Sequence, residues 1–429
     1  MSRSNAILLA LCISAVVAPA FSADPPPRTT TPEPAAPADE IDPATGLART
    51  TVVRPLRDAG APPKAPLAAP ATAPPSAPAT APLGRPAGAP DFGPAVPGAV
   101  DVSKPHIALI LPIASPQLGR LADAVRQGFA AAAEAEGRNA PPVVLMNVEN
   151  DGLALLDACR RAQANGALLV VTGLTRDGAT GVARSDCTRM PVLTLNQPAA
   201  EASGEPHPRL YSISLSLEQE ARQAALLAVA EGWHSAIVIT SPSPLSKRVQ
   251  EAFEREWQRA AGEISGRITF SGGPDDAPLV KERIAQLIRG DMVFLALDQP
   301  EARSVRPYVS GMLPVYATSM SVDPKAEATV NVDLQGVRYT DMPWFVQPDH
   351  PAVMVYPQPK SPMSVEHERL YALGIDAYRI ASVLLHGDTS KLTLDGVTGK
   401  ITLEAGNQFA RALTPAEIDG GRIIPLKQP

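Results

Sequence analysis

Buried strands and amphipathic helices alternate in the hydrophobic pattern of the chain from about residue 106. A near-continuous apolar run over 106–113 predicts a parallel strand that is buried on both faces. Apolar positions at helical spacing then predict a helix that Pro116 opens and Gly137 ends. The alternation continues with strands expected over 143–148, 167–172, 191–195 and 210–215, and with helices expected over 153–164 and up to about 187.

A second set of strands and helices follows the first. Helices are expected over 218–231, 245–261, 277–289 and from 301, and strands over 236–240, 265–270, 292–297 and 313–317. From about residue 330, one long helix (367–385) and several turn-rich strands are expected to complete both lobes. Such alternation is typical of doubly wound parallel sheets. The sequence therefore predicts an α/β fold of the periplasmic binding protein type I class, with two sheets joined by a hinge.

This reading divides the globular part, residues 105–429, into two lobes. The first lobe is expected over about 105–216 together with C-terminal segments, and the second over about 217–335.

The first 22 residues have the pattern of a secretory signal peptide. Arg3 provides a positive start, an apolar run follows over 6–17, and small residues at Ala20 and Ser22 fit cleavage after Ser22. The alternative is a lipoprotein signal in which Cys12 carries the lipid, but the bulky Leu11 precedes Cys12 where a small residue is expected. We therefore expect a protein exported to the periplasm, without an outer-membrane lipid anchor through Cys12.

Residues 23–104 are dominated by proline and alanine, with about twenty of the 47 prolines in the chain. Such a composition cannot bury enough apolar surface to offset the entropy of ordering the backbone. The sequence predicts a disordered linker between the signal peptide and the globular part.

The overall charge of the chain excludes several classes of partner. The formal net charge is −6 and aromatic residues make up only 4% of the sequence. Nucleic-acid binding and attachment to an acidic membrane surface both require a basic footprint. Neither function is expected.

Cys159 and Cys187 are the two cysteines that remain after signal cleavage. In an oxidising compartment such a pair is interpreted first as a disulfide, and both cysteines lie in segments expected to be consecutive helices. Two buried free thiols are the alternative. A metal site would need further ligands, and no histidine lies fewer than twenty residues from either cysteine to activate a nucleophile.

Polar residues follow the predicted strands at the ends where ligands bind in two-lobed α/β proteins. The candidate cleft residues are Ser115, Thr175 and Asn196 in the first lobe and Ser241, Asp298 and Ser319 in the second. Asp298 and Thr175 fit the ammonium and carboxylate groups of an amino-acid-like ligand. The alternative is that these residues cap helices, which Ser, Thr, Asn and Asp commonly do.

No catalytic or metal-binding motif stands out. The six histidines show no metal-ligand pairing, His367-Glu368 lacks the second histidine of a zinc helix, and no nucleophile elbow or phosphate-binding loop occurs. We expect no enzymatic activity, no metal and no cofactor.

Four groups of segments resemble the LppC/LpoA-type penicillin-binding protein activators. They are 107–113 with 124–129, 171–174 with 190–196, 339–344, and 370–378 leading to 395–400. The first two groups are common to the whole type I binding-protein class, whereas the last two are more specific to the activators. The resemblance covers about residues 104–403.

The resemblance implies a non-enzymatic protein that docks on a class A penicillin-binding protein and stimulates peptidoglycan synthesis. Tyr339 and Trp344, beside Pro343, are candidate partner-binding anchors, with burial in a lobe core as the alternative. The chain departs from well-known members because it has no convincing lipobox and no helical-repeat domain is expected ahead of the binding-protein fold. The alternative function is a substrate-binding receptor for an amino-acid-like solute of an ABC transporter.

Overall fold

The computed structural model of the protein describes residues 105–199, 207–273, 275–287, 289–386 and 392–427. The predicted signal peptide (1–22) and linker (23–104) lie outside the described residues.

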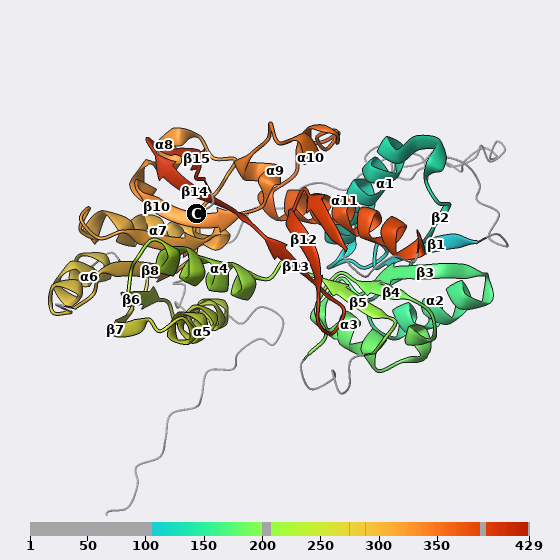
Figure 1. Cartoon of the computed structure of the whole chain (residues 1–429), viewed down its shortest axis with the longest axis horizontal. Helices are drawn as coiled ribbons and strands as arrows, with labels where there is room; N and C mark the ends of the chain where they lie inside the picture. Colours follow the sequence, from blue (N-terminus) through green and yellow to red (C-terminus); the bar gives the residue numbers. More distant parts are fainter. Residues whose placement is uncertain (1–104, 200–206, 274, 288, 387–391, 428–429) are drawn as a thin grey trace, which may run out of the picture. The chain divides into compact units, whose positions relative to one another are not determined.

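Two mixed, largely parallel sheets organise the described chain (Figure 1). The first has eight strands in the order β11-β12-β13-β5-β4-β3-β1-β2, and the second has seven in the order β15-β14-β10-β9-β8-β6-β7. The strands of the first sheet are β1 (His106–Leu111), β2 (Val143–Asn147), β3 (Ala167–Thr172), β4 (Val192–Thr194), β5 (Leu210–Ile213), β11 (Thr393–Gly396), β12 (Gly399–Glu404) and β13 (Gln408–Ala412). Those of the second are β6 (Ser235–Thr240), β7 (Glu263–Thr269), β8 (Met292–Ala296), β9 (Val315–Thr318), β10 (Val337–Asp341), β14 (Thr414–Asp419) and β15 (Arg422–Pro425).

Helices cover both faces of each sheet. The helices of the first lobe are α1 (Gly119–Glu136), α2 (Leu153–Ala164), α3 (Arg176–Ala183) and α11 (Val365–His386), with the short 3₁₀ helix η2 (Asp186–Arg189). Those of the second are α4 (Leu217–Ala230), α5 (Pro244–Arg259), α6 (Asp276–Ala285), α7 (Gln299–Val305) and α8 (Ala328–Asn331), with η5 (Ser319–Ser321). The predicted doubly wound architecture is confirmed: β1 pairs parallel with β2 and β3, and β6 pairs parallel with β8, with helices in the connections between these strands.

The antiparallel strands come from the C-terminal part of the chain. Strand β12 pairs antiparallel with both β11 and β13, and β14 pairs antiparallel with both β10 and β15. Short connections account for the antiparallel pairs β11–β12, β12–β13 and β14–β15, whereas β10 and β14 are antiparallel although a long segment separates them in the chain. The second sheet therefore extends past residue 335, where the sequence analysis placed the end of the second lobe, and includes β10, β14 and β15.

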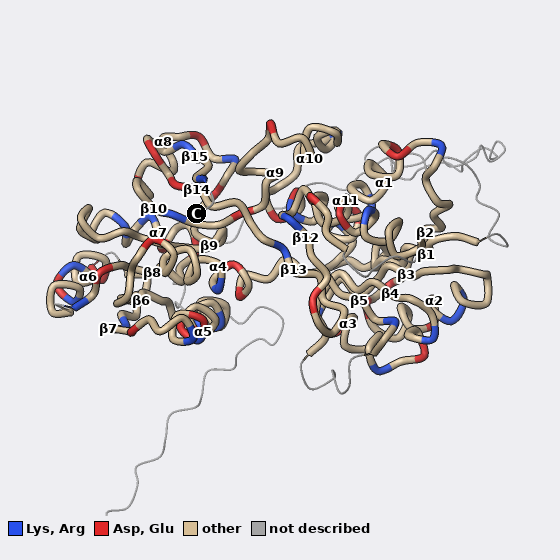
Figure 2. Tube along the Cα trace, in the orientation of Figure 1, with Lys and Arg blue, Asp and Glu red and all other residues tan. Residues whose placement is uncertain are grey.

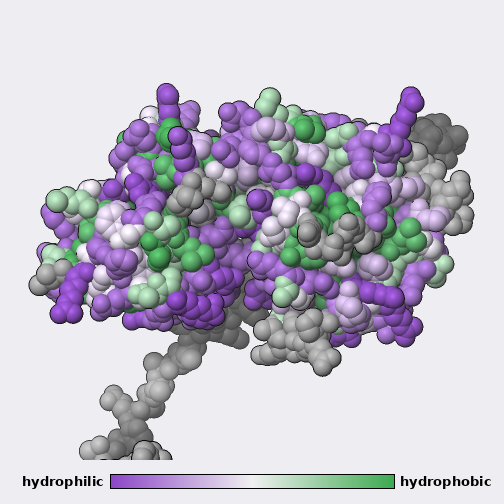
Figure 3. All heavy atoms as spheres, viewed as in Figure 1, coloured by the Kyte–Doolittle hydropathy of each residue, from purple (hydrophilic) through white to green (hydrophobic). Residues whose placement is uncertain are grey.

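Each sheet carries a hydrophobic core on each face. In the first lobe, one core lies under α1 and α11 and the other under α2 and α3. In the second lobe, α4 and α5 cover one face and α6 and α7 the other. On the face seen in Figure 3, hydrophilic residues cover most of the surface and line both sides of the hollow between the lobes.

The chain passes between the two lobes three times. The first crossover segment, residues 214–216, joins β5 to α4, and the second, residues 342–364, joins β10 to α11. The second contains the short helices α9 (Pro343–Val346) and α10 (Pro351–Met354). The third crossover segment is Leu413, between β13 and β14. These three segments form the hinge between the lobes.

Candidate functional site

A cavity of about 360 Å³ lies where the first lobe, the first crossover segment and the second lobe meet. Its lining residues are Arg176, Asn196 and Gln197 from the first lobe, 214–216 from the crossover, and Leu217, Glu218, Leu245 and Arg248 from the second lobe. We refer to it as the cleft cavity.

The first turns of three helices line the cleft cavity. Arg176 is the first residue of α3, Leu217 is the first of α4, and Leu245 is the second of α5. The partial positive charge of a helix dipole is concentrated at this end, where backbone N–H groups lack helical acceptors. Three such ends directed at one cavity favour a negatively charged ligand.

The guanidinium groups of Arg176 and Arg248 add to the positive character of the cavity. Arg248 Nε donates to Glu218 Oε1 at 3.0 Å, and Ser216 Oγ donates to Glu218 Oε2 at 2.9 Å. Burial raises the pKa of Glu218, but hydrogen bonds from its own backbone N–H, Ser216 and Arg248 outweigh burial and lower the pKa. Glu218 is therefore ionised at neutral pH and neutralises part of the charge of Arg248.

Arg176 and Ser214 supply unused hydrogen-bonding capacity. Within the part of the chain that the structure describes, neither the exposed Arg176 guanidinium nor the Ser214 hydroxyl has a hydrogen-bond partner. Ser214 is only 4% exposed. A buried hydroxyl without a partner has lost its hydrogen bonds to water, which costs free energy on folding, and it can form a hydrogen bond with a ligand.

Asn196 is the one predicted cleft residue that lines this cavity. Its side-chain Nδ2 donates to the Leu174 carbonyl at 3.2 Å, and its Oδ1 accepts from the Gln197 N–H at 2.9 Å. These two bonds fix the amide at the mouth of the first lobe.

Two other predicted cleft residues cap helices. Thr175 is the N-cap of α3 and accepts from Gly178 N–H at 3.0 Å, while its own hydroxyl donates to Asp151 at 2.7 Å. Asp298 forms a capping box with Glu301 at the start of α7. Both hydroxyl and carboxylate are therefore engaged by the protein itself, as the capping alternative describes.

The remaining three predicted cleft residues also have internal partners. Ser115 Oγ accepts from Leu118 N–H at 3.3 Å. The buried Ser241 hydroxyl lies 2.9 Å from that of Ser246, and the Ser319 N–H donates to Glu220 at 3.0 Å. These residues do not line the cleft cavity.

The structure places Tyr339 and Trp344 in the interior. Tyr339 is 0% exposed and Trp344 3% exposed. The Trp344 indole N–H donates to Glu368 at 3.0 Å, and its ring lies 5.6 Å from that of Tyr371. This corrects the anchor interpretation in favour of the core alternative, because a buried ring has no surface to offer a partner.

Cys159 of α2 and Cys187 of η2 form a disulfide whose Cα atoms lie 5.6 Å apart. The bond ties η2 to the helix that covers one face of the first sheet. Both cysteines are buried, so we interpret the disulfide as a structural bond rather than a reactive one.

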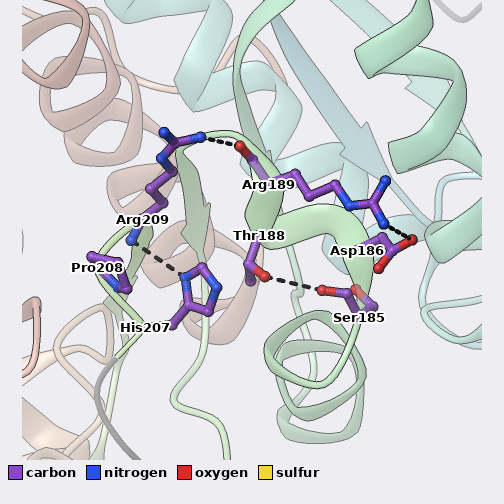
Figure 4. A pocket seen from close by; sticks show the side chains of 7 residues that line it. All are labelled: Ser185, Asp186, Thr188, Arg189, His207, Pro208 and Arg209. Carbon is purple, nitrogen blue, oxygen red and sulfur yellow. Dashed lines mark hydrogen bonds and ion pairs between the residues drawn. The ribbon is translucent and has the colours of Figure 1, made fainter.

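A second cavity, of about 490 Å³, lies beside this disulfide at η2 and the start of β5 (Figure 4). Arg189 pairs with Asp186 at 3.0 Å, and the Arg209 guanidinium donates to the Arg189 carbonyl. Thr188 Oγ donates to the Ser185 carbonyl at 3.0 Å. Its polar groups largely satisfy one another, so this cavity is a weaker candidate than the cleft cavity.

Sequence reasoning did not identify Arg176, Ser214 and Arg248. Arg176 directly follows Thr175, at the end of a predicted strand. Its position therefore indicated a cleft residue, but the sequence analysis assigned ligand binding to the neighbouring Thr175 hydroxyl. Ser214 and Arg248 line the same cavity because the tertiary fold brings the first crossover segment close to the start of α5. No local sequence pattern predicts this approach.

Among the described residues, no group of three or more His, Cys, Asp or Glu side chains is arranged to hold a metal ion. Within the same ranges, no helix combines the length and apolar character needed to cross a bilayer.

Comparison with solved structures finds the same fold in proteins of two kinds. A chain described as a "putative branched-chain amino acid ABC transporter" from Chromobacterium violaceum is 36% identical, with a TM-score of 0.64, and the match covers 73% of this chain and all of that one. The C-domain of LpoA from Haemophilus influenzae, described as a regulator of PBP1A, is 22% identical with a TM-score of 0.60, covering 75% of this chain and all of that domain.

Curated relatives carry the name penicillin-binding protein activator LpoA. The protein of that name from Pantoea ananatis is 26% identical over 313 residues, which is 62% of this chain and 45% of the relative. The chain thus spans about half the length of the curated relatives it matches.

A family model matches most of the globular part of the chain. Its description is "LppC putative lipoprotein", and it matches residues 99–289 and 288–421. Together these two matches include the first sheet, the second sheet except its edge strand β15, and all three crossover segments. The chain belongs to the LppC family.

Proposed function

We propose that this protein is a non-enzymatic activator that binds a class A penicillin-binding protein in the periplasm and stimulates peptidoglycan synthesis. The observation that carries the proposal is the LppC family match over residues 99–421. The names of the curated relatives and of the H. influenzae C-domain support it, since they describe an activator and a regulator of a penicillin-binding protein. Export by the predicted signal peptide would place the protein in the same compartment as its partner.

The proposal is tested by reconstitution with the class A synthase of the same organism. Purified protein is added to the synthase, and glycan polymerisation and peptide cross-linking are measured separately with lipid-linked precursor. We expect at least one of the two rates to rise with increasing protein until it saturates, and we expect a complex in pull-down.

A synthase that has only the transpeptidase domain serves as the control, and its rate is expected to stay constant. The proposal fails if saturating protein changes neither rate of the class A enzyme and no complex is recovered.

A second candidate function is small-solute reception in the cleft cavity. It is favoured by the three helix N-termini and the unpartnered Ser214 hydroxyl, which together suit the carboxylate of an amino-acid-like ligand. The name of the C. violaceum chain points in the same direction. This function would use Arg176 to bind the ligand carboxylate and Glu218 to bind a ligand ammonium group.

Thermal-shift measurements separate the second function from the first. A ligand that binds only the folded protein raises the melting temperature by mass action. Wild type, Arg176→Ala and Ser214→Ala are compared over amino acids and muropeptide fragments, with Arg160→Ala on the exposed face of α2 as the matched control. A shift lost in the two cavity variants and kept in the control supports reception, whereas a flat response in wild type rejects it.

A further inference from the structure

Five ionisable side chains of both signs lie buried around the hinge. Glu220, Asp341, Asp376 and Arg411 are each at most 4% exposed, and Arg369 is largely buried beside them. Figure 2 shows positively and negatively charged positions lying together near the labels of α9, β12 and β13. Removing charges from water is unfavourable unless each one is paired and hydrogen-bonded. The bonds that these five side chains form near the crossover segments must therefore offset the cost of their burial.

Arg411 connects the third crossover segment to the first. Its Nε donates to the Ser214 carbonyl at 2.9 Å, and its Nη1 donates to the Thr398 carbonyl at 3.0 Å. Ser214 belongs to the first crossover segment. Arg411 lies two residues before Leu413, which is the third crossover segment. A rotation of one segment relative to the other would break the bond to Ser214.

Gln223 of α4 holds the third crossover segment from the side of the second lobe. Its Nε2 donates to the Arg411 carbonyl at 2.9 Å, and its Oε1 accepts from the Leu413 N–H at 2.8 Å. One side chain thus binds the backbone on both sides of Ala412. The amide of Gln223 acts as a clamp on the point where the chain leaves the first lobe.

The second crossover segment is held at both ends. Asp341 precedes it and forms a two-pronged ion pair with Arg369 of α11, in which Arg369 Nη2 donates to Asp341 Oδ2 at 2.7 Å. The Arg369 guanidinium also lies over the Phe345 ring, 4.9 Å from its centre. Further along, Thr414 Oγ1 donates to Gln347 at 3.2 Å, which joins the second segment to the first residue of β14, directly after the third segment.

Domain closure in a two-lobed protein requires the φ and ψ angles of the connecting segments to change. Here each of the three segments is bonded to another segment or to a helix of a lobe. We propose that the side-chain bonds of Arg411 and Gln223, the Asp341–Arg369 ion pair and the Thr414–Gln347 hydrogen bond lock the hinge. The two lobes then keep one relative orientation whether or not the cleft cavity is occupied. The protein then acts as one rigid body rather than as a closing receptor. This inference does not depend on the proposed activator function.

The lock is tested by measuring distances between the lobes in the full chain. Spin labels are attached at Arg160→Cys on α2 and Arg255→Cys on α5, two exposed positions in different lobes. Cys12 is replaced by Ser, and Cys159 and Cys187 are protected by their disulfide. Double electron–electron resonance then reports the distribution of distances with and without a mixture of amino acids.

We expect one narrow distribution in the labelled wild type, unchanged by the amino acids. The hinge variant Gln223→Leu/Thr414→Val keeps side-chain volume but loses the bonds to Arg411, Leu413 and Gln347. It is expected to raise a second distance population to about 10% or more. Arg303→Met is the matched control, because its ion pair with Asp333 lies within the second lobe. It is expected to match wild type.

Two populations in wild type, or a shift on adding amino acids, would overturn the proposal. So would a folded hinge variant whose distribution equals that of wild type. Should the double variant fail to fold, hydrogen exchange of Gln223→Leu alone decides the matter. The Leu413 amide is expected to exchange about tenfold faster than in wild type, since it loses its side-chain acceptor. An unchanged exchange rate contradicts the lock.

Discussion

A Cβ atom added to Gly374 would lie 2.2 Å from the carbonyl oxygen of Val125. At the same crossing, a Cβ atom on Gly128 would lie 1.8 Å from the Tyr371 carbonyl oxygen. Helices α1 and α11 therefore approach each other through backbone rather than side chains. Because both contacts are with backbone atoms, the helices must separate to admit even one methyl group.

Gly374→Ala is expected to lower the free energy of unfolding by about 1–3 kcal/mol, the usual cost of overpacking. Urea titration of the purified variant measures this change. The control is Gly181→Ala in α3, where an added Cβ meets no atom within 4 Å. That change should stabilise the protein by up to about 1 kcal/mol, since alanine favours helix. Equal stability of Gly374→Ala and wild type would contradict the described crossing.

Removing the Cys159–Cys187 disulfide is expected to destabilise the first lobe. The bond closes a loop between residues 28 apart in sequence, so the unfolded chain gains entropy when the bond is absent. The loss predicted for such a loop is about 3–4 kcal/mol. Urea unfolding of Cys159→Ser/Cys187→Ser measures it. Dithiothreitol should destabilise wild type and leave the double variant unaffected; insensitivity of wild type would show that the thiols are free.

Glu220 is expected to make stability depend on pH. Burial raises the pKa of its carboxyl, and the Asp341 carboxylate acts in the same direction, while Arg369 and Arg411 oppose it. A carboxyl whose pKa is higher in the folded than in the unfolded chain stabilises the fold below the unfolded pKa, about 4.3 for Glu. That contribution is lost as the pH rises through the folded pKa.

Glu220→Gln removes this titration. The stability of wild type minus that of Glu220→Gln should therefore decrease as the pH rises from about 4 toward neutrality. Urea titrations at a series of pH values measure the difference. Glu251→Gln replaces an exposed carboxylate on α5 and is the control. A difference between wild type and Glu220→Gln that does not vary with pH would exclude a raised pKa at Glu220.

Ser214→Ala is expected to stabilise the protein by about 1 kcal/mol, because it removes a buried hydroxyl that has no partner. Ser321→Ala should do the opposite, since the buried Ser321 hydroxyl donates to the Leu297 carbonyl at 2.6 Å. Thermal unfolding of the two variants measures both signs. Destabilisation by both substitutions would indicate that the Ser214 hydroxyl has a partner in solution, such as bound water.

Most of the fold was predictable from the sequence for a simple reason. Strands such as β1 and β8 are buried on both faces, so their apolar runs differ from the amphipathic helices around them. The helix over 153–164 was placed correctly because Gly166 ends its pattern, and α7 starts at the capping box formed by Asp298 and Glu301.

The candidate site was less predictable, because its residues meet through tertiary structure. Polar residues at strand ends suggested ligand contacts, but a helix N-cap needs the same residue types, so Thr175 and Asp298 fit both descriptions. The hinge partners Asp341 and Arg369 lie 28 residues apart, on a strand and a helix of different lobes. Nothing in the local sequence of Asp341 indicates its partner.

The strand order also has a consequence for the biogenesis of the protein. Strand β13 pairs with β5 in the first sheet, and β14 pairs with β10 in the second. A chain made from its N-terminus onward therefore leaves β5 and β10 as open edges until its last few dozen residues have emerged. Open edges invite pairing with other chains. A premature stop before residue 400 would leave both lobes incomplete, so C-terminal truncation should yield an aggregating chain rather than one intact lobe.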